Sequence, residues 1–315
     1  MTPEVAPTIT FEKISDHIIS HLDSGNYITD FVKLRYNSSN GQLWRGDSLV
    51  WLKSIPANTI DLVFADLPYN IKKAHWDMFH SSYAYIEWCL EWIAEVHRIL
   101  KPSGTFYICG FSEIVAEMVS PSMQYFKGIK WLIWHYKNKA NLGKDWGRSH
   151  ESILHFRKSS EFTFNVDSVR TPYHSHTLKY PERTQAESSQ YANNGDLRSW
   201  LPHPAGSKAK DVIEIPTTCN GMHEKTPHPT QKPEELLRKL ILASTNIGDI
   251  VLDPFVGSGT TAVCAEQLQR KWLGCDMEPT YLDWAVMRLK QVEQKPVEYW
   301  IELDRKTQKR RMSIR

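Results

Sequence analysis

Short apolar runs alternate along the chain with segments in which apolar residues recur every three or four positions. The run from Ile60 to Phe64 has the length of a buried strand and ends at Asp66. A stripe at helical spacing follows between Ile86 and Leu100 and stops at Pro102. Three more strand-sized runs come next, at residues 105–110, 130–137 and 151–158.

The second half of the chain starts with an irregular segment and then resumes the alternation. From about residue 160 to 226 no strand or helix period persists, so this stretch is expected to be functional or disordered. A helix is expected from Pro233 onward. The order strand, helix, strand, helix follows at 249–255, 260–268, 271–276 and 281–292. This alternation predicts an α/β fold with a Rossmann-like, doubly wound, mainly parallel sheet covered by helices on both faces.

Composition narrows the class of protein. The 315 residues, 41% hydrophobic and 23% charged, suit one large globular domain or a catalytic domain with an insertion. No apolar run approaches the roughly 20 residues of a membrane helix, and the first residues lack a secretory signal pattern, so we expect a cytoplasmic protein. The five cysteines show no C-x-x-C spacing and the histidines no ligand spacing, which predicts neither disulfides nor a metal.

Charge is unevenly distributed although the net charge is only +2. Between Lys127 and Arg183 there are 11 Lys or Arg against 5 Asp or Glu, which favours a nucleic-acid partner for this region. A second basic cluster lies between Arg305 and Arg315, and we expect it to be a solvated tail rather than a binding site.

A glycine-containing loop follows the strand that ends at Asp253. Gly257 and Gly259 lie in the turn that opens the next helix, where the absence of a Cβ lets the backbone approach a ligand. Asp276 ends the following strand, where its carboxylate can accept hydrogen bonds from both hydroxyls of a ribose. Together these residues predict a pocket for an adenosine-containing molecule, and the absence of a Lys after the glycines disfavours a phosphate-binding P-loop.

The residues Asp66, Leu67, Pro68 and Tyr69 form a second motif, D-x-P-Y, at the end of another predicted strand. Ligands of open α/β sheets bind beyond the carboxyl ends of the strands. We therefore expect this loop and the glycine loop to face one crevice.

These motifs resemble those of the amino-methylating DNA methyltransferases. The D-P-P-Y and F-x-G-x-G motifs of that family match Asp66–Tyr69 and Phe255–Gly259, in the order typical of its β class. The segments HPTQKP (His228–Pro233) and HESILHFRK (His150–Lys158) extend the resemblance, which covers about residues 43 to 292. Leu67 stands where the family has its first proline.

The resemblance implies the fold of the S-adenosylmethionine-dependent methyltransferases and a pocket for that cofactor. Its lining is expected from Asp253, Phe255, Gly257, Gly259, Thr260 and Asp276, with His228, Thr230 and Lys232 at the amino-acid end of the cofactor. Asp47 is a weaker cofactor-side candidate and equally a candidate helix cap.

The catalytic loop is expected to methylate an exocyclic amino group of a flipped base. Such a nitrogen is a poor nucleophile, and Asp66 with the Pro68 carbonyl can accept its N–H bonds while Tyr69 stacks on the base. No metal and no covalent intermediate are required. An acidic first residue, as in Asp66, accompanies adenine N6 in the family, whereas Ser accompanies cytosine N4. We therefore predict an adenine-N6 enzyme, with cytosine N4 as the alternative.

Other classes of protein explain fewer of these features. A nucleic-acid-binding module without activity does not need an adenosine pocket, and a dehydrogenase does not need the D-x-P-Y loop. A methyltransferase that acts on RNA or on protein amides is harder to exclude, because related loops serve planar amino groups in general.

We divide the chain into four parts. Residues 1–159 form the catalytic half, 160–226 the inserted target-recognition region, 227–300 the cofactor-binding half, and 301–315 the basic tail. Double-stranded DNA is the expected partner. A homodimer and a cognate restriction enzyme of a restriction–modification system are left open.

Overall fold

The computed structural model describes residues 10–23, 32–68, 79–138, 144–184 and 199–313. It divides into two compact units, of which the first comprises Met1–Phe164 with Asp211–Lys295 and the second Asn165–Lys210 with Pro296–Arg315. None of the helices in the described ranges is long and apolar enough to cross a membrane.

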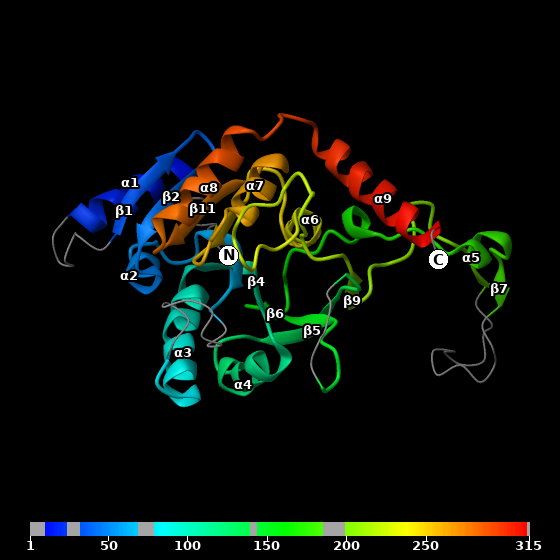
Figure 1. Ribbon diagram of the computed structural model, residues 1–315, viewed down its shortest axis with the longest axis horizontal. Coiled ribbons are helices and arrows are strands. Elements are labelled where there is room, and N and C mark those ends of the chain that lie inside the picture. The colour runs from blue at the N-terminus through cyan, green and yellow to red at the C-terminus, as the bar shows by residue number, and fades with distance from the viewer. Residues whose placement is uncertain (1–9, 24–31, 69–78, 139–143, 185–198, 314–315) are drawn as a thin grey trace, which may run out of the picture. The chain divides into compact units, whose positions relative to one another are not determined.

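A mixed sheet forms the centre of the first unit (Figure 1). Among the described residues its strands are β1 (Val32–Asn37), β2 (Gly41–Gly46), β3 (Ile60–Asp66), β4 (Leu100–Gly110), β5 (Gly128–His135), β6 (His150–Arg157), β9 (Val212–Glu214), β10 (Ile250–Asp253) and β11 (Lys271–Asp276). Their order in the sheet is β1-β2-β11-β10-β3-β4-β6-β5-β9. The neighbours from β2 to β4 all pair in parallel, whereas β1 pairs antiparallel with β2, and β6 with both β4 and β5. The predicted mainly parallel sheet is confirmed.

Helices cover both faces of this sheet, as predicted (Figure 1). In the first unit they are α1 (Phe11–Asp23), α2 (Ser48–Lys53), α3 (Ser82–Ile99), α4 (Ser112–Ser122), α6 (Glu234–Ser244), α7 (Thr260–Gln267) and α8 (Pro279–Lys290). The chain leaves β3 through α3 toward β4 and leaves β10 through α7 toward β11, in opposite directions along the sheet. Right-handed crossovers then place α3 and α7 on opposite faces. The adjacent strands β3 and β10 therefore form the switch point of the sheet.

Apolar patterning explains the central elements. Ile60 to Ala65 of β3 are all buried, since a strand covered on both faces needs no polar alternation. Helix α3 begins four residues before the predicted stripe, where the Ser81 side chain accepts a hydrogen bond from the Ala84 backbone N–H. Strand β4 begins at Leu100, earlier than expected, because Leu100 already pairs with Ile60 of β3. Regular pairing resumes only at Thr105, opposite Leu62.

The elements before Ile60 were not predicted. Strands β1 and β2 are short, and most residues of β1 are exposed to solvent, so neither strand gives a long apolar run. Strand β2 nevertheless pairs with β11 and brings the following residue, Asp47, to the end of the sheet that holds the predicted site.

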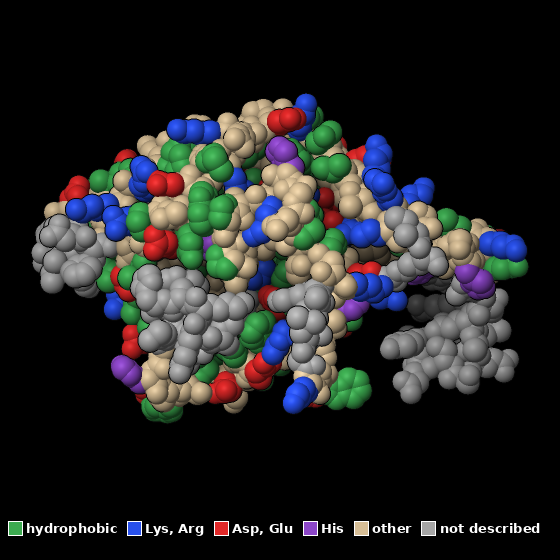
Figure 2. Space-filling view, viewed as in Figure 1, with side chains coloured by type: hydrophobic (Ala, Val, Ile, Leu, Met, Phe, Trp, Pro, Cys, Tyr) green, Lys and Arg blue, Asp and Glu red, His purple; other side chains and the backbone are tan. Residues whose placement is uncertain are grey.

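Among its described residues, the second unit has short elements besides one long helix. These are η1 (Val166–Val169), α5 (Ser175–Lys179), β7 (Arg183–Thr184), β8 (Ser199–Trp200) and α9 (Val297–Ser313). Within it, Arg305 of α9 donates a hydrogen bond to the Asp167 carbonyl at 3.1 Å. The segment that we expected to be a tail is thus largely helical. Lys306, Lys309 and Arg310 are exposed, and Lys and Arg side chains follow this helix on the face in Figure 2.

Candidate active site

The two predicted loops lie at the carboxyl ends of neighbouring strands. Strands β3 and β10 pair in parallel, with Leu62 opposite Val251 and Val63 opposite Leu252, so the D-x-P-Y and glycine loops emerge at the same edge of the sheet. A cavity of about 200 Å³ lies there, at the switch point where α/β sheets bind ligands. Of the predicted site residues, it is lined by Asp47, Asp66, Pro68, His228, Thr230, Lys232, Asp253, Phe255, Gly257, Thr260 and Asp276.

Asp276 is oriented by the backbone around it. Its two carboxylate oxygens accept hydrogen bonds from the N–H groups of Gly257 (2.8 Å) and Glu278 (2.9 Å). Burial raises its pKa to about 6, against the opposing effect of these backbone donors. The carboxylate is therefore fixed at the cavity wall in a position to accept hydrogen bonds from hydroxyl groups.

Asp253 lies at the base of the glycine loop. It accepts hydrogen bonds from the Phe255 backbone N–H (2.9 Å) and the Thr261 hydroxyl (2.5 Å). Burial raises the pKa of Asp253 to about 7, although both donors favour its charged form. These contacts fix the turn between β10 and α7.

The two glycines of the loop have different surroundings. Gly257 lines the cavity with φ +49°, and a Cβ there would lie 3.0 Å from the His228 ring. Gly259 is the N-cap residue before α7 and has φ +82°, and its Cβ would lie 2.6 Å from the Ala285 Cβ of α8. Gly259 is not part of the lining, so its position serves the close packing of α7 on α8.

His228 forms a neutral part of the wall. Burial, reinforced by the nearby Lys232 and Lys225, lowers its pKa to about 3. The ring of Tyr281 meets the imidazole edge-on, with centroids 4.4 Å apart. Asp47 lines the cavity and also caps α2, since its carboxylate accepts a hydrogen bond from the Val50 N–H at 2.9 Å.

Lys232 contacts the D-x-P-Y motif directly. Its ammonium lies 2.6 Å from the Asp66 carboxylate and 3.5 Å from that of Glu151, the second residue of β6. We predicted Lys232 for the cofactor and did not single out Glu151. The sequence did contain a signal for Glu151, because a carboxylate within an apolar strand pattern needs a buried partner.

The rest of the catalytic loop is partly described. Leu67, at the position of the missing proline, is 3% exposed and belongs to the hydrophobic core. The Pro68 carbonyl accepts a hydrogen bond from the Tyr85 hydroxyl at 2.6 Å, which leaves its second lone pair for another donor. Tyr69 lies outside the described residues, so its stacking role stays a prediction.

Aromatic side chains form another part of the cavity lining. Trp88 and Trp92, one turn apart on α3, pack against Phe255 with ring centroids 5.7 Å and 5.3 Å away. We did not predict the two tryptophans, because α3 is distant in sequence from the glycine loop. Planar heteroaromatic rings stack well on such a surface.

Comparison with known proteins identifies the family of the chain. The family model described as DNA methylase matches residues 60–287. The chain belongs to this family. It is 34% identical to the Type II methyltransferase M1.MboII of Moraxella bovis over 256 residues, covering 77% of this chain and 94% of that protein. It is also 34% identical to the DNA adenine methyltransferase YhdJ of Escherichia coli, covering 81% and 84%.

Solved structures share the fold. PvuII DNA methyltransferase (cytosine-N4-specific) superposes with a TM-score of 0.61 at 19% identity, covering 87% of this chain and 94% of that one. The M1.HpyAVI–SAM complex gives a TM-score of 0.50 at 23% identity, covering 79% and 100%. The chain is thus a DNA methyltransferase with the predicted methyltransferase fold.

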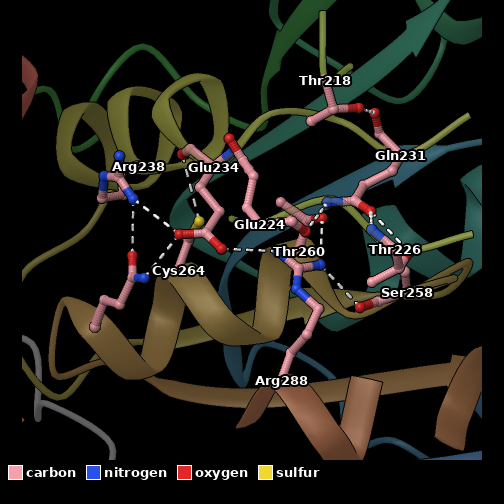
Figure 3. Close-up of polar contacts among 11 residues, drawn as sticks. Thr218, Glu224, Thr226, Gln231, Glu234, Arg238, Ser258, Thr260, Cys264 and Arg288 are labelled. Atoms are coloured by element: carbon pink, nitrogen blue, oxygen red, sulfur yellow. Dashed lines mark hydrogen bonds and ion pairs between the residues drawn. The ribbon is translucent and has the colours of Figure 1, made fainter. Parts of the chain in front are cut away.

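A buried polar network contacts the glycine loop of this methylase (Figure 3). Arg288 of α8 donates hydrogen bonds to the Ser258 carbonyl and the Thr260 hydroxyl, both at 2.9 Å, and pairs with Glu234 of α6 at 2.8 Å. Glu234 also accepts hydrogen bonds from Arg238 (3.1 Å) and Gln267 (2.8 Å). Burial alone would raise the pKa of Glu234, but Arg288 and the other donors lower it, so the carboxylate stays charged.

The same network extends to the HPTQKP segment. The Glu234 backbone N–H donates a hydrogen bond to the Glu224 carboxylate at 2.7 Å. The Gln231 side-chain amide donates one to the Glu224 backbone carbonyl at 2.6 Å. The side-chain oxygen of Gln231 in turn accepts hydrogen bonds from the backbone N–H and the hydroxyl of Thr226. Two segments that line the cavity are therefore held by one set of contacts.

We expect Arg288→Met to lower the free energy of unfolding by about 3 kcal/mol, because it removes a partner of a buried carboxylate and two loop contacts. Chemical denaturation measures this loss. Arg35→Met is the matched control, since Arg35 pairs with Asp283 of the same helix but both side chains are half exposed, and such pairs contribute about 0–1 kcal/mol. A loss below about 1 kcal/mol for Arg288→Met would contradict the stabilising role of the network.

Proposed function

We propose that this DNA methyltransferase methylates N6 of adenine in double-stranded DNA, on a base flipped into the cavity. The observation that carries the proposal is the position of Asp66, whose carboxylate lines the same cavity as the glycine loop and Asp276. An acceptor for the amino group and a site for a nucleoside are thus adjacent. The 34% identity to a protein named DNA adenine methyltransferase supports adenine as the base.

S-adenosylmethionine is the methyl donor, and it supplies a methyl group on a positively charged sulfur. The lining fits this molecule in three respects. Gly257 leaves the space that a Cβ would fill, and the fixed Asp276 carboxylate suits ribose hydroxyls. His228 is neutral and so adds no positive charge to the wall of a pocket that would hold a cationic donor.

Asp66 and Pro68 act on the amino group of the base. The Asp66 carboxylate and the Pro68 carbonyl accept its two N–H bonds, which directs the nitrogen lone pair toward the methyl group. In this proposal Asp66 also takes the proton that the nitrogen loses after transfer. Tyr69 is assigned to stacking on the base, and target reading to residues within 160–226.

Cytosine N4 is the second candidate. The fold similarity to a cytosine-N4-specific methyltransferase favours it, but at 19% identity that similarity concerns the fold. Asp at the first motif position and the adenine-named relative favour N6.

The methylated base is identified by expressing the chain in a host without adenine methylation, digesting its DNA to nucleosides and analysing them by mass spectrometry. We expect N6-methyladenine, absent from cells that express the Asp66→Ala variant. N4-methylcytosine as the sole product would overturn the assignment of the base and leave the roles of the residues standing.

A further inference from the structure

Helix α9 has one shielded face and one exposed face. Val297 and Trp300 are buried, and half-buried residues continue their side of the helix at 301, 304, 305, 308, 311 and 312. On this shielded face Arg305 donates its hydrogen bond to the Asp167 carbonyl of η1. The exposed residues form the opposite side, at 298, 299, 302, 303, 306, 307, 309, 310 and 313. One face therefore holds the helix within the second unit, and the other faces solvent.

The charge of the exposed face changes along the helix. Glu298 and Glu302 lie in its first two turns, whereas residues 305–313 include no Asp or Glu. Lys306 is 3.5 Å from the Glu302 carboxylate, one turn before it. Lys309 and Arg310 come next, and neither forms an ion pair with another described residue. These three cations form the basic face of α9, and Figure 2 shows Lys and Arg side chains along this helix.

The stability of the helix does not account for this basic face. Lys306 and Arg310 are four residues apart, and like charges at that spacing repel each other and destabilise a helix. The helix dipole favours cations within the last turn, which includes Arg310 but not Lys306 or Lys309. Exposed cations that the fold does not need are suited to an anionic partner.

Duplex DNA is the anionic partner that fits. The chain belongs to the DNA methylase family, and the second unit also contains residues 165–210, most of the segment assigned to target reading. A helix rises about 1.5 Å per residue, so Lys306 and Arg310 are about 6 Å apart along its axis, close to the length of two phosphates along one DNA strand, at about 3.4 Å each. Long Lys and Arg side chains at this spacing can reach neighbouring phosphates together.

We propose that the basic face of α9 binds the phosphate backbone of DNA and supplies affinity that does not depend on sequence. Phosphate contacts fix a protein on the duplex and carry no sequence information themselves. Base reading stays with residues 160–226, so this inference rests on the proposed function. The segment that we expected to be a solvated tail is then part of the DNA-binding surface.

The test measures the salt dependence of DNA binding by the full chain. The double variant Lys309→Gln with Arg310→Gln removes two cations from the basic face. Fluorescence anisotropy with a labelled duplex of about 30 base pairs of mixed sequence, between about 50 and 200 mM salt, should show the slope of log affinity against log salt reduced in magnitude by about 2, and affinity at about 100 mM salt reduced about tenfold or more. The melting temperature should stay unchanged, because both side chains are exposed.

Lys13→Gln with Lys53→Gln is the matched control, because it removes the same charge from another surface. Both lysines are exposed. Lys53 ends α2, which leads from the cavity toward the amino end of β3. Lys13 lies in the first turn of α1, where the Phe11 ring contacts the ammonium of Lys271 at the start of β11. Both thus lie at the edge of the sheet opposite the cavity, and this variant should bind DNA with the slope and affinity of wild type.

The methylated sites separate affinity from base reading. The double variant Lys309→Gln with Arg310→Gln should methylate the same sites as wild type in the DNA of an expressing host, at a lower level. Methylation-sensitive sequencing maps these sites. A changed set of sites would show that α9 reads sequence and would overturn its role as a backbone contact.

The remaining outcomes distinguish this inference from the proposed function. An unchanged slope in the double variant, an equal change in the control, or a reduced slope in the charge-conserving variant Lys309→Arg with Arg310→Lys would each overturn the role of α9. Wild-type binding to the duplex without N6-methyladenine in host DNA would refute the assigned base and not the role of α9. The absence of wild-type binding would refute both.

Discussion

Asp66→Ala should reduce methyl transfer at least about a thousandfold, because it removes both the proposed acceptor that orients the amino group and the proposed acceptor of its proton. Affinity for S-adenosylhomocysteine should stay within about threefold of wild type, since the nucleoside is assigned to Asp276 and the glycine loop rather than to Asp66. Single-turnover assays with labelled donor measure the first quantity, and calorimetry measures the second.

The structure offers a control on the same strand. Asp61→Ala removes a buried carboxylate at the opposite end of β3 and should retain methyl transfer in the folded fraction. If Asp66→Ala kept more than about a tenth of wild-type turnover, the catalytic role of Asp66 would be wrong, because general acid–base groups contribute at least about a hundredfold.

Gly257→Val should reduce cofactor affinity about a hundredfold, equivalent to about 2–3 kcal/mol. The first added carbon would lie 3.0 Å from the His228 ring, and the two γ-methyl groups of valine would extend into the space around it, in a backbone conformation of φ +49°. Calorimetric titration with S-adenosylhomocysteine is the measurement.

Gly248→Val separates strain from obstruction. Gly248 has φ +84°, and a Cβ there would meet no atom within 4 Å. Both variants should lose about 1–3 kcal/mol of stability through backbone strain, but only Gly257→Val should lose affinity. An equal affinity loss in both would show that destabilisation, and not the cavity, explains the effect.

Much of the central fold could be predicted because its signals are local. The apolar run of β3 and the glycine loop after β10 are each readable within about ten residues. The rule that parallel strands present their carboxyl ends at one edge then brings Asp66 and Asp253 to the same cavity across the sheet.

What could not be predicted depends on neighbours in space. The partners of Lys232 come from β3 and β6, and the aromatic surface next to Phe255 comes from α3. Gly259 illustrates the same limit, since a glycine in a cofactor motif gives no indication that its own Cβ would collide with another helix. Motif spacing therefore predicts the residues of a site more reliably than it predicts the atoms that those residues contact.

Leu67 links the catalytic loop to the folding of the whole unit. A proline would restrict the backbone at this position even in the unfolded chain, whereas leucine leaves about 1–2 kcal/mol of backbone entropy to be lost on ordering. Burial of the leucine side chain, which is 3% exposed, contributes about 2 kcal/mol and offsets that cost. The backbone at Leu67 is thus held by the packing of its side chain in the core rather than by a proline ring, and this restraint is lost when the core unfolds.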